Sequence, residues 1–242
     1  MKILLNGACG RMGQEVDKFV TASERHSIAA RVDRAGDCIK DIEDFHGEAD
    51  VIVDFSNHLG TQALLSYAVK NKIPAVIATT GHTDEENSII QQAAKEIPVF
   101  HSANMSLGVA LLVELAMKTA EVMPDADIEI VETHHNRKLD APSGTALMIA
   151  KAIQRVRENS VFNFGRSGTK KRESNEIGIH AVRRGNIVGI HEVLVSTDSQ
   201  TITIKHEAHS RALFAEGAIS AAEFICNKPA GLYDMNSIVR GE

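Results

Sequence analysis

The sequence predicts an α/β protein in which a doubly wound parallel sheet is joined to a second, α+β domain with an open mixed sheet. Three observations lead to this prediction. Short β-rich runs alternate with helical stretches over the first hundred residues, a glycine-rich turn follows the first run, and the pattern changes after Met105. The alternation is typical of βαβ units, in which helices connect consecutive parallel strands.

Five short runs are the strand candidates of the first domain. Several of them, such as ILL, VIV and AVIA, are apolar at successive positions rather than at alternate ones. Continuous apolar runs are expected where helices cover both faces of a parallel sheet. The five runs are 2–6, 28–33, 51–55, 75–79 and 98–101.

The pattern after Met105 predicts a second domain. A long apolar helix is expected over 106–122 and a strand over 127–133, while the run TITIK at 201–205 alternates apolar and polar side chains. Such alternation predicts a sheet with one buried and one exposed face. The segment 158–176 is rich in glycine, serine, asparagine and cations, so we interpret it as a mobile loop. A helix over 211–227 and a short tail follow.

The composition is that of an ordinary globular protein. The 242 residues are 43% hydrophobic and carry a formal net charge of -6, which argues against a general nucleic-acid-binding surface. No apolar run is long enough for a signal peptide or a membrane span, so a cytoplasmic protein without a membrane partner is expected. Cys9, Cys38 and Cys226 form no CxxC pair, which predicts buried or incidental thiols rather than a disulfide framework or a zinc site.

The turn after the first strand has the sequence GACGRMG, from Gly7 to Gly13, and opens a helix. Glycines in this position allow a tight turn and a close approach of the backbone to a dinucleotide pyrophosphate, whose charge the helix amides stabilise. The spacing is GxxGxxG rather than the commoner GxGxxG, and glycines also mark ordinary turns, so the position favours dinucleotide binding more than the spacing does. The cofactor-binding residues expected here are Gly7, Ala8, Cys9, Gly10, Arg11 and Met12.

Two charged residues follow the second predicted strand. Asp33 would accept hydrogen bonds from the ribose hydroxyls and repel a 2′-phosphate, whereas Arg34 would pair with that phosphate. NADH and NADPH therefore both stay open, and a solvated carboxylate beside a surface cation is the alternative. Two further segments are expected to line the cofactor because they lie at the carboxyl ends of strands. They are Ala78, Thr79 and Thr80, and Ser102, Ala103, Asn104 and Met105.

The densest polar cluster lies between a predicted strand and a predicted helix, over residues 129–146. Pro142 to Thr145 is typical of a helix start, whose free amides and the Ser143 and Thr145 hydroxyls would bind a carboxylate. Lys138 and a histidine add positive charge, so a small dianion would fit. Histidine side chains in general titrate near neutrality, so one of the two histidines, His134 and His135, would assist proton transfer while the other binds substrate.

Two other interpretations of this cluster remain. One is a helix cap with surface histidines. The other is metal ligation, but adjacent histidines on an extended segment point to opposite sides and do not readily share one ion, so no metal is expected.

The cluster closely resembles the signature of the dihydrodipicolinate reductase family, ExHHxxKxDAPSGTA, which is complete from Glu132 to Ala146. The resemblance extends over essentially the whole chain. It includes GACGRMG, VDFS at 53–56, ATTG at 78–81, NMSLGV at 104–109, IG at 177–178, RRGNIVG at 183–189, and SR and FAEGA at 210–218. The stretch between Asp33 and Val51 is shorter than is usual in the family, which would trim or remove a helix, and Ala78 stands where glycine is common.

The resemblance implies NADH- or NADPH-dependent reduction of a cyclic imine dicarboxylate, 4-hydroxy-tetrahydrodipicolinate, in lysine and diaminopimelate biosynthesis. It implies that His134 is the acid/base residue and Lys138 the proton donor. The implied substrate-binding residues are His135, Lys138, Ser143, Gly144 and Thr145.

The resemblance also implies a division of the chain into domains. A dinucleotide-binding domain would consist of 1–105 and 212–242, and a substrate-binding and tetramerisation domain of 106–211, with homotetramers formed through the sheet of the latter. The domain split further suggests closure about hinges near Met105 and Arg211.

Two rival functions are weighed against this one. An aspartate-semialdehyde-type dehydrogenase would need a nucleophilic cysteine in a catalytic loop, and none of the three cysteines lies in one. A non-catalytic nucleotide-sensing protein would be favoured if the cluster of two histidines and a lysine were missing, but it is complete.

Overall fold

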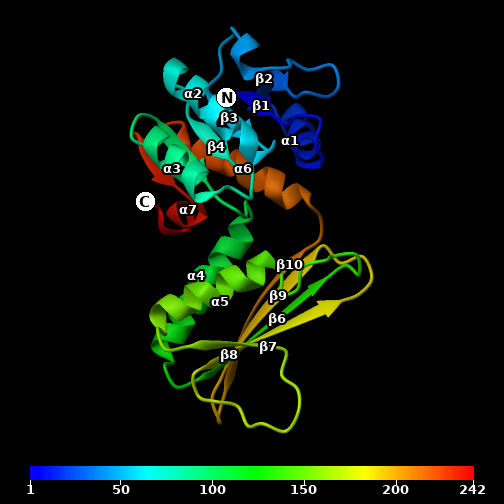
Figure 1. Cartoon of the computed structure of the whole chain (residues 1–242), viewed down its shortest axis with the longest axis vertical. Helices are drawn as coiled ribbons and strands as arrows, with labels where there is room; N and C mark the ends of the chain where they lie inside the picture. The colour runs from blue at the N-terminus through cyan, green and yellow to red at the C-terminus, as the bar shows by residue number, and fades with distance from the viewer. The chain divides into compact units, whose positions relative to one another are not determined.

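The computed structural model describes residues 1–242 and divides the chain into two compact units (Figure 1). The first unit comprises Met1–Leu107 and Arg211–Glu242, and the second comprises Gly108–Ser210. The chain thus leaves the first unit and later returns to it. No helix in the structure is long and apolar enough to span a membrane.

The first unit contains a six-stranded parallel sheet in the order β11-β5-β4-β3-β1-β2. The five predicted strands are all present, and the chain's tail adds the sixth at the edge next to β5. The strands are β1 (Lys2–Asn6), β2 (Ser27–Val32), β3 (Val51–Asp54), β4 (Ala75–Ile77), β5 (Pro98–His101) and β11 (Gly231–Tyr233).

Helices cover both faces of this sheet. On one face, α2 (Thr61–Asn71) and α3 (Asp84–Ala93) bury Leu64, Leu65 and Ile90 against strand residues such as Leu4 and Ile77. On the other face, α1 (Arg11–Thr21) packs on α6 (Ala212–Ile225), and both helices contact strands. The continuous apolar strand runs follow from this two-sided burial. The first unit also contains α7 (Met235–Arg240) and the 3-10 helices η1 (Ile42–Asp44) and η2 (His58–Gly60).

The short segment between β2 and β3 holds no α-helix. Only the single turn η1 lies there, with the Asp41 side chain capping it at the Glu43 amide. This agrees with the expectation that the shortened stretch has lost a helix.

The second unit is built on a five-stranded mixed sheet in the order β10-β9-β6-β8-β7. β6 pairs with β8 in parallel and with β9 antiparallel, β9 pairs antiparallel with β10, and β7 pairs in parallel with β8. Its strands are β6 (Asp127–His134), β7 (Val161–Phe164), β8 (Glu176–Arg183), β9 (Gly189–Ser196) and β10 (Thr201–Ala208). The predicted α/β fold with a second, open mixed sheet is confirmed.

Two helices cover one face of this sheet, α4 (Leu107–Val122) and α5 (Gly144–Val156) (Figure 1). Leu112 and Ala116 from α4 and Ile149 and Ile153 from α5 are buried in the same core as the inward-facing strand residues. Those strand residues are Ile128, Ile130, Ile177, Ile179, Val193 and Val195. The opposite face carries the alternate, more polar positions, as in the sequence of β10.

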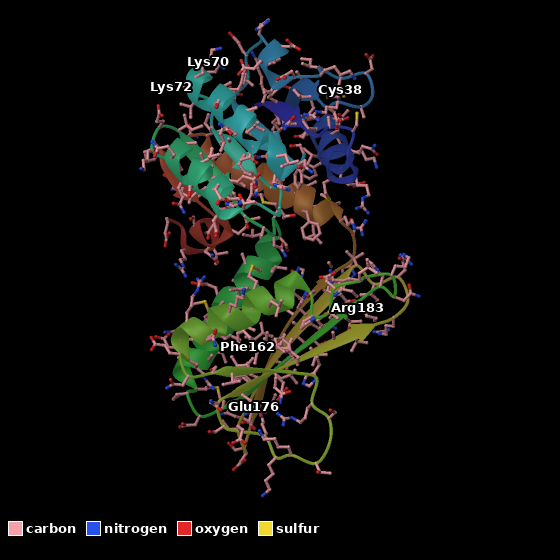
Figure 2. All side chains as sticks on the ribbon, in the orientation of Figure 1. Cys38, Lys70, Lys72, Phe162, Glu176 and Arg183 are labelled. Atoms are coloured by element: carbon pink, nitrogen blue, oxygen red, sulfur yellow. The ribbon has the colours of Figure 1, made fainter.

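The prediction of a mobile loop over 158–176 is wrong for its first part. Residues 161–164 form the edge strand β7, and Phe162 packs against the core of the second unit (Figure 2). The cations of the segment also find partners, because Arg166 pairs with Glu176 and Arg172 pairs with Asp127 and Glu129. The segment forms a strand despite its polar composition, because its three apolar side chains favour pairing with the free edge of β8. Its cations do not prevent this, since they pair with carboxylates on β6 and β8.

Candidate active site

The glycine loop, which we define as Gly7 to Gly13, turns tightly between β1 and α1 in the first unit. Gly7 has φ of +79°, and a Cβ there would lie 2.6 Å from the Phe55 carbonyl oxygen. A Cβ on Gly13 would lie 2.1 Å from the Gly7 carbonyl oxygen, so only glycine lets the first turn of α1 pack on the loop. Gly10 is the N-cap of α1, which begins at Arg11. A close-packed glycine turn at a helix start after β1 fits a dinucleotide pyrophosphate.

Asp33 connects this loop to the end of β2. Its Oδ2 accepts a hydrogen bond of 2.9 Å from the Cys9 amide, and its Oδ1 accepts one of 2.9 Å from the Ala35 amide. The carboxylate is half-buried, whereas the neighbouring Arg34 is exposed. The structure therefore brings Asp33 to the glycine loop, and it leaves Arg34 accessible to solvent.

The buried carboxylate of Asp54, which is not among the predicted site residues, joins the ends of three neighbouring strands. It accepts hydrogen bonds from Asn6 Nδ2 on β1 at 2.8 Å, from Thr79 Oγ1 after β4 at 2.7 Å and from Ser56 Oγ at 2.6 Å. Burial raises the pKa of Asp54 above its ordinary value, against the opposing effect of these hydrogen bonds. The sequence signal was the polar pair that follows the apolar run VIV in VIVDFS.

The other predicted cofactor-lining residues lie in different environments. Thr79 is held by Asp54, Ala78 is buried and Thr80 is exposed. The Ser102 hydroxyl donates to the Asn104 carbonyl at 2.8 Å, which shapes the turn after β5, and Ala103 is exposed on that turn. Met105 is buried, with its carbonyl packed against Gly217 of α6, so it supports the fold of the first unit.

The polar cluster of the second unit is organised by Glu132, which is completely buried near the end of β6. Its Oε2 lies 2.6 Å from His134 Nδ1, and the two Arg183 Nη atoms donate to its two oxygens, each at 2.7 Å. The Ser143 amide donates to Oε1 at 2.9 Å. One carboxylate therefore ties together β6, the end of β8, where Figure 2 shows Arg183, and the start of α5.

The electrostatics of Glu132 are set by these partners. Burial by itself would raise the pKa of the carboxyl, but the hydrogen bonds from His134, Arg183 and the Ser143 amide outweigh burial and lower the pKa to about 2. Glu132 is therefore ionised at neutral pH. An ionised partner fixes the orientation of the His134 ring, as a carboxylate does for a catalytic histidine in other enzymes.

His134 is buried, which corrects the alternative of surface histidines. Its Nε2 points toward Gly189, where a Cβ would lie only 3.1 Å away, so glycine leaves room for the ring. His135 is half-buried, and its amide donates to the Ile187 carbonyl at 2.8 Å. Lys138 Nζ lies 2.9 Å from Asp140 Oδ1, and the ammonium lowers the pKa of the Asp140 carboxyl.

The start of α5 contains the proposed carboxylate site. Ser143 is the N-cap, and its Oγ accepts from the Ala146 amide at 3.2 Å and lies 3.1 Å from His191 Nε2. The Ser143 hydroxyl is buried in these contacts and serves as a cap. Gly144 is exposed, and a Cβ on it would meet no atom within 4 Å, so there is open space beside the first residue of the helix.

Arg183 and His191 are parts of this cluster to which sequence reasoning gave no role. Arg183 is paired in register with His134 across β6 and β8, and His191 is paired with Glu132 across β6 and β9. The signal for Arg183 was the run RRGN, which lies far from the cluster in the sequence. Only strand pairing brings these side chains together.

His191 makes the stability of the second unit depend on pH. The pKa of His191 is lowered from 6.5 to about 4, mainly by burial and next by the nearby His134. His206 and Lys138 lower the pKa further, whereas the Glu132 carboxylate raises it. Its Nδ1 has no hydrogen-bond partner. The unfolded chain takes up this proton as the pH falls from 6.5 to 4, whereas the folded chain does not. His191 should therefore cost up to roughly 3 kcal/mol of stability over that range.

We expect His191→Gln to flatten the decline in the free energy of unfolding between pH 6.5 and 4, measured by urea denaturation at a series of pH values. His209→Gln, which replaces an exposed histidine of the same unit, is the matched control and should keep the wild-type pH dependence. Parallel curves for wild type and His191→Gln would contradict the assignment of a depressed pKa to His191.

Comparisons with known proteins agree with both halves of the fold. The family model described as "Dihydrodipicolinate reductase, N-terminus" matches residues 1–105, and the one described as "Dihydrodipicolinate reductase, C-terminus" matches residues 108–239. The 4-hydroxy-tetrahydrodipicolinate reductase of Caldanaerobacter subterraneus subsp. tengcongensis is 45% identical, over 99% of this chain and 98% of that protein. The protein of the same name from Clostridium novyi is 43% identical, over 100% of this chain and 99% of that protein.

A solved structure is also similar to the whole chain. It is a dipicolinate-bound dihydrodipicolinate reductase from Paenisporosarcina sp. TG-14, with 25% sequence identity, a TM-score of 0.80 and coverage of 97% of both chains. Matches of the family models over both units and identities above 40% over the full length leave one assignment. The chain belongs to the dihydrodipicolinate reductase family.

Proposed function

We propose that this chain reduces 4-hydroxy-tetrahydrodipicolinate with NADH or NADPH, a step of lysine and diaminopimelate biosynthesis. The observation that carries the proposal is the buried cluster in which Glu132 clamps His134 beside the start of α5, since the complete family signature folds into it. The names of the relatives and the dipicolinate bound to the similar structure support the same substrate class.

The residues of the first unit would hold the nicotinamide dinucleotide that the family uses. The amides of Ala8 to Met12, at the start of α1, would bind the pyrophosphate, and Asp33 would accept hydrogen bonds from the adenosine ribose. Thr79, Thr80 and the turn at 102–104 would lie along the nicotinamide half, at the carboxyl ends of β4 and β5. When bound, the dinucleotide supplies the hydride for the reduction.

The residues of the second unit would hold the dicarboxylate. The amides of Gly144 and Thr145 open α5, and a helix N-terminus favours an anion. His135 and Lys138 add donors for the carboxylates. The Ser143 hydroxyl already contacts the Ala146 amide and His191. Ser143 would therefore contribute as the N-cap that holds the start of α5, where the substrate carboxylate would bind.

The same cluster would supply the proton. As hydride adds to the conjugated imine ring, negative charge develops toward the ring nitrogen, and a proton from Lys138 or His134 must neutralise it. Glu132 holds His134 through Nδ1 and leaves Nε2 as the nitrogen for exchange with substrate or water. Asp140 Oδ1 lies 2.9 Å from Lys138 Nζ, and this contact would help to position the lysine side chain as the donor.

The direct test is the replacement of His134 or Lys138 by alanine. Each variant should lower kcat by about 100-fold or more, because a positioned proton donor is lost, and each should stay folded. The measurement is a steady-state assay with the product of dihydrodipicolinate synthase and NADH or NADPH, with folding checked by circular dichroism.

Lys151→Ala is the matched control, since Lys151 is an exposed lysine on α5. It should retain the wild-type rate. Near-normal turnover in folded His134→Ala and Lys138→Ala would exclude the assigned proton chemistry, and an inactive wild type would overturn the proposed function.

We also propose dual cofactor use with some preference for NADH. Asp33 would bind the ribose and repel a 2′-phosphate, and the exposed Arg34 would offset that repulsion. Asp33→Ala should shift the ratio of kcat/KM toward NADPH and Arg34→Ala toward NADH, each by about 10-fold, as expected for one charge-assisted contact. If both variants kept the wild-type ratio, these side chains would not contact the adenosine ribose.

We further propose that the chain forms a homotetramer through the uncovered face of the sheet in the second unit. Val131 and Leu194 are half-buried and alternate with core residues of β6 and β9, so they point away from α4 and α5.

Analytical ultracentrifugation tests this proposal and should give the mass of four chains of 26.2 kDa each. Val131→Glu should dissociate the assembly and Lys118→Glu, on exposed α4 surface, should not; a monomeric wild type would refute the proposal.

A further inference from the structure

Two cysteines that lie far apart in the sequence meet in the first unit. The sulfur atoms of Cys9 and Cys38 are 3.4 Å apart. Cys9 belongs to the glycine loop before α1, and Cys38 lies on the loop between β2 and η1, where Figure 2 labels it. Both side chains are half-buried and carry free thiols, and the sequence-based interpretation of buried or incidental thiols did not include their contact.

The surrounding structure holds the Cys9 sulfur beside the second loop. The Cys9 amide donates to Asp33 Oδ2, and the Cys9 sulfur lies 3.4 Å from the Ala35 carbonyl oxygen. Gly36 has φ of +63°, and a Cβ on it would lie 2.7 Å from this sulfur. A side chain at position 36 would displace the sulfur, so glycine keeps space open for Cys9 next to Cys38.

Neither Cys9 nor Cys38 is fully buried, so part of each residue is exposed to small reagents. Burial and the adjacent Cys9 thiol raise the pKa of Cys38, so this residue is a thiol at neutral pH. Oxidation should accordingly be slow at neutral pH and faster in mildly alkaline solution, where more thiolate is present. The sulfur of Cys226, the third cysteine, lies 3.5 Å from Met1 Sδ and 3.9 Å from the Asp50 carbonyl oxygen.

We propose that Cys9 and Cys38 form a reversible oxidation site whose disulfide weakens dinucleotide binding. With hydrogen peroxide as the oxidant, one thiolate attacks a peroxide oxygen, the O–O bond breaks, and a sulfenic acid and a hydroxide ion result. The hydroxide takes a proton from solvent and becomes water. The second thiol then attacks the sulfenic sulfur, the S–S bond forms and a second water leaves. A small dithiol reverses the step and becomes a disulfide itself.

The effect on binding follows from where the two loops lie. A disulfide needs the sulfurs to approach from 3.4 Å to about 2.05 Å, so the glycine loop or the 34–38 loop must move. The moving segments carry the amide that Asp33 accepts from and flank Asp33 itself. This part of the inference depends on the proposed binding of the dinucleotide at the glycine loop, whereas disulfide formation does not.

The test compares wild type, Cys38→Ser and Cys226→Ser as full-length proteins. Each is treated with hydrogen peroxide at pH 8, its free thiols are alkylated, and it is digested with trypsin without reduction. Cleavage after Lys2, Arg11, Arg34 and Lys40 releases residues 3–11 and 35–40 as separate peptides unless a disulfide joins them. Mass spectrometry should find the joined peptide in wild type and Cys226→Ser, and dithiothreitol should remove it.

Binding of NADH, followed by its fluorescence, provides the second measurement. Oxidation should raise the Kd of wild type and Cys226→Ser by about 10-fold, as expected for a displacement of about 1 Å in a binding loop, and dithiothreitol should restore it. Cys38→Ser should bind NADH equally well before and after peroxide.

The outcomes separate the two parts of the inference. Absence of the joined peptide when Cys9 and Cys38 are still alkylated would overturn the oxidation site. A joined peptide with an unchanged Kd would overturn the effect on binding. If reduced wild type failed to bind NADH or NADPH at all, the proposed function would fail, and the peptide map would still decide whether the thiols form a disulfide.

Discussion

The second unit depends on one buried carboxylate, Glu132. A charged group without solvent is costly unless donors surround it, and here four donors from β6, β8 and the start of α5 point at its two oxygens. The orientation of His134, the position of Arg183 and the direction of the α5 start are thereby coupled. Loss of any one donor would leave the buried negative charge of Glu132 poorly compensated. The geometry around His134 is therefore determined by the hydrogen bonds to Glu132 as well as by the packing of the His134 ring.

The first unit contains a comparable buried carboxylate, Asp54, whose pKa is shifted in the opposite direction. Asp54 is also fully buried and also joins several strand ends, yet its donors are the neutral groups of Asn6, Ser56 and Thr79. Burial dominates there and raises the pKa of Asp54, whereas Arg183 and His134 help to lower the pKa of Glu132 to about 2. At Asp54 burial outweighs the neutral donors, whereas at Glu132 the hydrogen bonds from His134, Arg183 and the Ser143 amide together outweigh burial.

Local packing explains why particular small residues stand at the two sites. Gly13 lets α1 pack on the glycine loop, Gly189 leaves room for the His134 ring and Gly36 leaves room for the Cys9 sulfur. In each case the atom that a Cβ would meet belongs to a segment distant in sequence or to the adjacent turn. The glycine loop, Asp33 and the 34–38 loop are therefore one connected structure, in which a change at Cys38 would reach the proposed adenosine site.

Local patterns in the sequence were enough to predict five of the six strands of the parallel sheet, the change of fold after Met105, a helix start within Pro142 to Thr145 and the residues of the family signature. Periodicity and capping are local properties, so they can be read from neighbouring residues. The strand β7 was missed, because an edge strand of four residues in a polar segment depends on the neighbour to which it pairs. The roles of Arg183, His191 and Asp54 and the contact of Cys9 with Cys38 were also decided only by tertiary structure. Strand register and loop packing bring these side chains together although they are far apart in the sequence. A local sequence pattern does not predict such long-range contacts.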